Sequence, residues 1–127
     1  MATRPSFTSG DIFTAVNANI LATSIVALNT QAGPAYTAAL TDVGRLVSFT
    51  SGTAVAFTIP ANATVAFSVG DQINVYQAGT ATVTITPAAT VTIRSSGAKL
   101  KTNDQFSVAT CIKIDTNEWI ALGNLKA

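Results

Sequence analysis

The chain has 127 residues, of which 48% are hydrophobic and 10% charged, and it carries a net charge of +1 with no histidine. Soluble domains average about 25% charged residues. Acid–base catalysis depends on positioned titratable groups, histidine most often. A nearly neutral chain also has no field that attracts nucleic acid or an anionic membrane. The composition therefore predicts a structural protein, neither an enzyme nor a cofactor protein, with no nucleic-acid or membrane partner.

The length and the single cysteine set the domain organisation. A chain of this size forms one domain and buries a core without disulfides or metal. A surface with so little charge favours an obligate oligomer over a threonine-coated monomer. Cys111 lies in the apolar run 108–112, which predicts a packed core or interface residue and no nucleophile. The first residues lack the pattern of a secretion signal, so synthesis in a cytoplasm is expected.

Residues 1–33 are predicted to form a helical or extended arm for assembly or attachment. The segment 9–11 offers capping groups, and the apolar residues that follow are spaced for one face of a helix over 11–29. A second apolar stripe includes Ile25 and Leu28, so the helix would bury one stripe in its own domain and one against a neighbour. The alternative is a helix folded back onto the sheet. The candidate assembly residues are Ile12, Phe13, Val16, Ile20 and Leu21.

Residues 34–127 are predicted to form an all-β domain, because the apolar period changes to two. Alternating runs predict strands near 46–49, 55–59, 65–69, 73–76, 82–86, 90–93, 106–114 and 118–122, and the segment 99–101 predicts a short exposed strand or edge. The runs 73–76 and 82–86 flank a glycine-containing turn, which predicts a hairpin. With no further helix, the pattern favours an antiparallel β-sandwich or a small jelly-roll-like barrel.

The oxygen-rich turn 115–118 is the strongest candidate for a chemical site. Asp115, Asn117 and Glu118 offer three oxygen ligands for a cation such as calcium. Aspartate and asparagine also favour hairpin turns for conformational reasons, so the turn alone accounts for them. A glycosidase needs two carboxyl groups about 5–9.5 Å apart, and Asp115 with Glu118 is the local pair. The metal and enzyme interpretations are the less favoured ones.

Two further features have a structural and a binding interpretation. Arg94, Lys99 and Lys101 gather positive charge, but no aromatic residue lies between Arg94 and Phe106 to stack on bases, so a solvated edge or an intersubunit contact is favoured. Trp119 is the sole tryptophan. Burial in the core is expected for it, and stacking on a sugar is the alternative.

Several motifs together resemble one class of proteins. The stretch Ser9-Gly10-Asp11-Ile12-Phe13-Thr14-Ala15-Val16-Asn17 resembles a Gly-Asp-x-apolar-Thr-Ala-x-x-Asn segment near the N-terminus of tailed-bacteriophage fibre and virion proteins. Residues 36–125 resemble a small β domain that recurs in such proteins. The motifs that carry this second resemblance are the segments 41–47, 59–60, 67–73, 77–83 and 118–125.

The resemblance implies a structural virion protein, usually trimeric, with no catalytic residues to transfer. Fibre proteins carry a long shaft before such a domain, and this sequence shows none. A capsid decoration (cement or head-fibre) protein on the capsid exterior is therefore expected, with the major capsid protein or another virion protein as its partner. The alternative is a tail-fibre tip or receptor-binding module that contacts host surface glycans.

Overall fold

The computed structural model describes residues 27–127, which form an all-β structure, as the sequence predicts. The described residues contain eleven strands and two short 3-10 helices. In chain order these are β1 (Leu28–Gln31), β2 (Ala35–Thr37), η1 (Leu40–Asp42), β3 (Leu46–Phe49), β4 (Val55–Ile59), β5 (Gln72–Gln77), β6 (Val83–Pro87), β7 (Thr92–Ser95), η2 (Ser96–Ala98), β8 (Lys101–Thr102), β9 (Val108–Asp115), β10 (Glu118–Gly123) and β11 (Leu125–Lys126).

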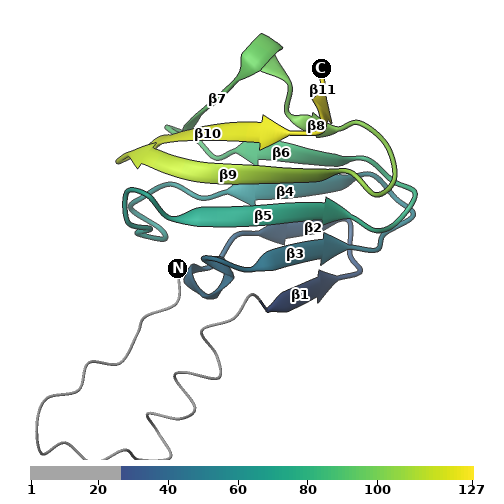
Figure 1. Cartoon of the computed structure of the whole chain (residues 1–127). Helices are drawn as coiled ribbons and strands as arrows, with labels where there is room; N and C mark the ends of the chain where they lie inside the picture. The colour runs from purple at the N-terminus through teal and green to yellow at the C-terminus, as the bar shows by residue number, and fades with distance from the viewer. Residues whose placement is uncertain (1–26) are drawn as a thin grey trace, which may run out of the picture.

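The strands form two sheets, and the first eight strands alternate between them. The six-stranded sheet has the order β1-β3-β5-β9-β10-β7, and the five-stranded sheet has the order β11-β8-β6-β4-β2. Each passage through one strand of each sheet makes one coil of chain. Successive coils stack, so that β1, β3 and β5 lie in sequence in one sheet while β2, β4 and β6 lie in sequence in the other (Figure 1).

The prediction of purely antiparallel pairing is wrong. The pairs β1–β3, β3–β5, β2–β4, β4–β6 and β7–β10 are parallel. The pairs β5–β9, β9–β10, β6–β8 and β8–β11 are antiparallel. Parallel neighbours need a crossover connection, which is usually a helix. Here a strand of the opposite sheet makes the crossover for the stacked coils, so parallel pairing arises without the strand–helix alternation that normally signals it.

The predicted hairpin between residues 73–76 and 82–86 is also wrong, because β5 and β6 belong to different sheets. The turn between β5 and β6 instead packs against the end of β3 in the preceding coil. The backbone N–H groups of Ala78 and Gly79 both donate to the carbonyl oxygen of Phe49, at 2.9 Å each. A Cβ atom on Gly79 would lie 2.4 Å from the carbonyl oxygen of Ser51. Glycine is thus required by this close approach of two backbones.

Two other segments differ from the sequence prediction. Residues 65–69 form no strand, and Phe67 enters the core from a loop while Val69 is exposed. Leu28 and Asn29, placed at the end of the predicted helix, belong to β1 and pair with β3 in parallel register. The sheet therefore begins before the predicted boundary at residue 33, because pairing with β3 satisfies the backbone of this segment. Residues 1–26 of the predicted arm lie outside the described residues.

The core contains side chains from both sheets. The six-stranded sheet contributes residues such as Val47, Ile73 and Val75, and the five-stranded sheet contributes Phe57 and Ile85, all of them fully buried. Burial of apolar surface of this kind is the main favourable term in folding. Across residues 27–127, no helix has the length and hydrophobicity needed to cross a membrane.

Candidate assembly surface

The outward faces of the two sheets differ in chemistry. Outward positions of β4 and β6 carry threonine or alanine, such as Thr58, Thr84 and Thr86. A polar outer face of this kind is normal for a sheet that contacts water on one side. Outward positions of β9 and β10 instead carry mainly large aliphatic residues. The six-stranded sheet therefore presents an apolar surface on the side away from the core.

We name the centre of this surface the apolar outer patch. It spans the adjacent strands β5, β9 and β10, where Ile120 is the register partner of Ile112 and Tyr76 that of Val108. Val108 is 46% exposed, Ile114 40% and Leu122 51%, so the aliphatic groups contact water directly. Contiguous apolar surface in a folded protein commonly marks an interaction site. The patch consists of Tyr76, Val108, Ile112, Ile114, Ile120 and Leu122.

Polar side chains within the same face hydrogen-bond to one another. The hydroxyl of Thr110 donates to Oδ1 of Asn74 at 2.8 Å, and Nε2 of Gln72 donates to the same oxygen at 3.1 Å. Nδ2 of Asn74 donates to the carbonyl oxygen of Arg45 at 3.3 Å. These bonds lower the free energy needed to bury the face in an interface, because burying a polar group is strongly unfavourable mainly when it has no hydrogen-bond partner.

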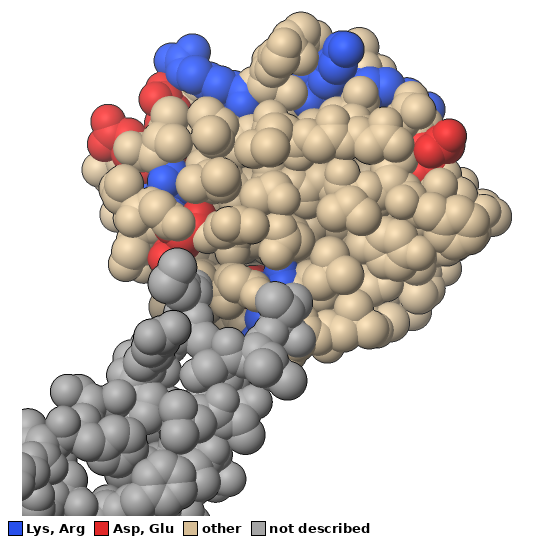
Figure 2. All heavy atoms as spheres, viewed as in Figure 1, with Lys and Arg blue, Asp and Glu red and all other residues tan. Residues whose placement is uncertain are grey.

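Charged side chains lie around the margin of this surface. Figure 2 shows a broad face with few charged atoms at its centre, with basic groups along one edge and acidic groups at the two sides. Nε of Arg94 and Oε1 of Glu118 form an ion pair of 2.8 Å between β7 and β10. The Arg94 side chain is 66% exposed and that of Glu118 30%. The pair neutralises one border of the patch, and its exposure makes its contribution to stability small.

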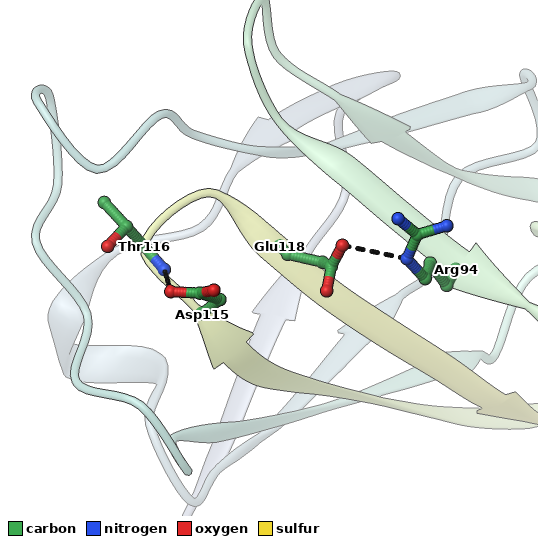
Figure 3. Close-up of polar contacts among 4 residues, drawn as sticks. All are labelled: Arg94, Asp115, Thr116 and Glu118. Carbon is green, nitrogen blue, oxygen red and sulfur yellow. Dashed lines mark hydrogen bonds and ion pairs between the residues drawn. The ribbon is translucent and has the colours of Figure 1, made fainter.

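The turn 115–118 does not gather its oxygen atoms around one point. Oδ1 of Asp115 accepts the backbone N–H of Thr116 at 2.7 Å, whereas Glu118 points to Arg94 (Figure 3). Oδ1 of Asn117 accepts the backbone N–H of Asn62 at 2.9 Å. Each candidate ligand thus has a separate partner. No group of three or more acidic, histidine or cysteine residues within 27–127 is arranged to hold a metal ion.

Trp119 and Cys111 are core residues, as the sequence predicts. Trp119 is 1% exposed, and its ring meets the ring of Phe67 edge-on, with 5.3 Å between centroids. Trp119 is therefore not available to stack on a sugar. Cys111 is fully buried, and this burial raises the pKa of its thiol from 9.0 to about 12. The thiol stays protonated at neutral pH, so Cys111 is not a reactive nucleophile.

The structure also buries polar groups that the sequence analysis did not identify. Lys113 is 2% exposed and Asp42 1% exposed. The alternation in β9 contains a signal for the lysine, because Lys113 shares its face with Cys111 and Ala109. Asp42 accepts hydrogen bonds from the hydroxyl of Tyr36 at 2.6 Å and from Nδ2 of Asn29 at 2.8 Å. Nothing in the local pattern of residues 40–42 indicates this network.

The five predicted assembly residues, from Ile12 to Leu21, lie outside the described residues. The basic residues separate: Arg94 is on β7 of one sheet and Lys101 on β8 of the other. The sequence matches no protein-family model and no curated protein.

Proposed function

We propose that this chain is a structural virion protein of a tailed bacteriophage, acting as a trimeric decoration (cement or head-fibre) protein on the capsid exterior. The observation that carries the proposal is the apolar outer patch on the outer face of the six-stranded sheet. A protein that acts by being buried in an assembly needs such a surface, and a catalyst does not. The motifs at residues 9–17 and 36–125, which resemble virion proteins, support the same assignment.

In this role the protein acts as a clamp. Each trimer sits where capsid subunits meet and contacts several of them at once. Binding only the assembled shell stabilises it by mass action, and three attachment points on one trimer raise the effective concentration of each. The part of the chain before β1 serves as the attachment arm, and its apolar residues Ile12, Phe13, Val16, Ile20 and Leu21 make the contact. No catalytic step and no cofactor are involved.

We also infer that the two sheets pack face to face as a β-sandwich. The contribution of both sheets to one core supports this architecture. A hydrogen bond between the sheets gives further support, because the hydroxyl of Thr102 on β8 donates to Oε1 of Gln77 on β5.

Binding to particles tests the proposed function. Purified full-length chain is added to capsids of the encoding phage from which this protein is absent, and the mixture is sedimented and imaged by cryo-electron microscopy. We expect saturable co-sedimentation and added density on the capsid exterior. The full-length variant Phe13→Ser/Ile20→Ser should lose this binding, and Thr58→Ser, which changes an outward threonine of β4, should keep it. Binding to host cells or glycans with none to capsids would replace the proposal with the receptor-binding alternative.

A further inference from the structure

We propose that copies of this chain meet through the outer face of the six-stranded sheet, with the apolar outer patch at the centre of the contact. The inference assigns an interface to the homotrimer of the proposed function, and it rests on that function only for the number of copies. The contact residues are those of the patch on β5, β9 and β10.

The first argument is the contrast between the two outer faces of one molecule. If the outer face of β9 and β10 contacted only water, we would expect outward threonine residues there, as on β4 and β6. Instead β9 carries apolar side chains on both of its faces, with Ala109 and Cys111 inward and Val108, Ile112 and Ile114 outward. A strand that is apolar on both faces is typical of burial on both faces. Removing a Val, Leu or Ile side chain from water contributes about 1.5–3 kcal/mol.

The second argument concerns the chemistry of the occupant. A glycan or a charged ligand is recognised by outward polar groups, whereas Asn74, Thr110 and Gln72 are already engaged with one another on this face. Arg94 and Glu118 at its border neutralise each other. The electrostatic complement of an uncharged, hydrogen-bonded face is another uncharged, hydrogen-bonded face, and a second copy of this chain supplies one. Its net charge of +1 gives little repulsion between copies.

The third argument is area and closure. With strands about 4.8 Å apart and a rise of about 3.3 Å per residue, the six-stranded face covers on the order of 500 Å² in projection. The accessible surface of side chains exceeds this projection, so it approaches the roughly 800 Å² that each partner buries in a standard interface. Three identical faces that meet around a threefold axis hide all three patches in a closed assembly, with none left to recruit further copies.

The test is the mass of the full-length protein in solution, measured by size-exclusion chromatography with light scattering. Wild type should have three times the 13.0 kDa chain mass. Ile112→Lys and Ile120→Lys should shift the protein to a single chain, because each buries an unpaired charge in the contact. The matched controls are Thr58→Lys and Thr84→Lys on the outer face of the five-stranded sheet, which should leave the mass unchanged.

Fluorescence of the buried Trp119 reports whether each variant is folded. If a lysine variant does not fold, Ile112→Thr and Ile120→Thr replace it, since threonine favours strands and is tolerated at outward positions. These variants should dissociate at protein concentrations at which wild type remains assembled. Folded patch variants with unchanged mass, or wild type as a single chain at all concentrations, would overturn the inference.

The outcomes separate this inference from the proposed function. Patch variants that dissociate while wild type fails to bind capsids would support the interface and remove the virion role. If wild type binds capsids while the patch variants remain trimeric, the virion role is supported and the proposed interface is overturned. If wild type is a dimer that the same variants dissociate, the contact face is supported and the threefold assembly is overturned.

Discussion

Nζ of Lys113 on β9 donates a hydrogen bond of 2.6 Å to Oδ1 of Asn62, in the loop that follows β4. The same ammonium group donates to the carbonyl oxygen of Phe67 at 2.7 Å. Within residues 27–127, Lys113 forms no ion pair. A buried cation is therefore held by neutral oxygens of the loop 60–71, and these bonds tie that loop to the six-stranded sheet.

Asn62→Ala should lower the free energy of unfolding by about 1–3 kcal/mol, the usual cost of leaving a buried polar group without its partner. The backbone N–H of Asn62 still donates to Oδ1 of Asn117 in this variant, so the loop keeps its other anchor. Urea unfolding followed by the fluorescence of Trp119 measures the change.

The variant Lys113→Met provides the control for this pair. Without the ammonium group, Asn62→Ala should cost much less, and the double-mutant cycle should give a coupling energy of about 0.5–3 kcal/mol. Equal effects of Asn62→Ala in both backgrounds would show that the hydrogen bond contributes nothing.

The buried hydroxyl of Thr102 joins the two sheets. It accepts the backbone N–H of Val83 at 2.9 Å and donates to Oε1 of Gln77. Thr102→Val keeps the shape but leaves both partners unsatisfied, so we expect a loss of about 1–3 kcal/mol in unfolding free energy. Thr58→Val on the outer face is the control and should change it by no more than about 0.5 kcal/mol. Equal unfolding midpoints for the two variants would contradict this role of Thr102.

The stacking of one coil on the next requires glycine at position 79. In Gly79→Ala the new methyl group would overlap the backbone at Thr50 and Ser51, with 2.4 Å to the nearest oxygen. We expect a loss of about 1–3 kcal/mol from this overpacking. Gly52→Ala is the matched control, since the nearest atom to its new Cβ is Oγ1 of Thr80 at 3.9 Å. Thermal unfolding of both variants checks the prediction, and a wild-type midpoint for Gly79→Ala would refute it.

Two groups with raised pKa values, the buried Cys111 and the partly buried Tyr36, predict a loss of stability at alkaline pH. Burial raises the pKa of Cys111 from 9.0 to about 12, and burial together with the hydrogen bond and charge of Asp42 raises the pKa of Tyr36 from 10.0 to about 12. Between these values the unfolded chain has released protons that the folded chain keeps. The free energy of unfolding should therefore fall as pH rises from about 9 to about 12.

Urea unfolding at about pH 8 and about pH 11 measures this loss. Cys111→Ala and Tyr36→Phe should each make the difference between the two pH values smaller, although Cys111→Ala lowers stability at both through the cavity it leaves. A difference as large as that of wild type in both variants would show that other groups cause it.

Most strand positions after residue 45 could be predicted from the sequence, with 65–69 as the exception, but strand partners could not. The alternation of Val55, Phe57 and Ile59 fixes a strand and its inward face, and the structure confirms both. The same alternation says nothing of the neighbour or its direction, so β5 and β6 were predicted as a hairpin although they lie in different sheets. The passage of the chain from β5 in one sheet to β6 in the other depends on contacts between residues distant in sequence, such as those of Gly79 with the end of β3.

The apolar outer patch has a signal in the sequence, because the run from Val108 to Ile112 carries apolar residues in both phases of the alternation. Its position on the surface requires knowledge of the sheet order. Ile112 and Ile120 become neighbours through the β9–β10 turn, and Tyr76 joins them only because β5 pairs with β9. The partners of Lys113 and Asp42 depend on similarly distant loops, so they could not be derived from local pattern.

The position of the β9–β10 hairpin between β5 and β7 constrains how the protein is made. On a ribosome, β5 and β7 emerge before the two strands that separate them, and β7 has its only partner among the described strands in β10. The six-stranded sheet therefore stays divided until β9 and β10 have been translated. Nascent chains that lack these strands leave one edge of β5 unpaired, and unpaired strand edges make incompletely folded chains prone to aggregate.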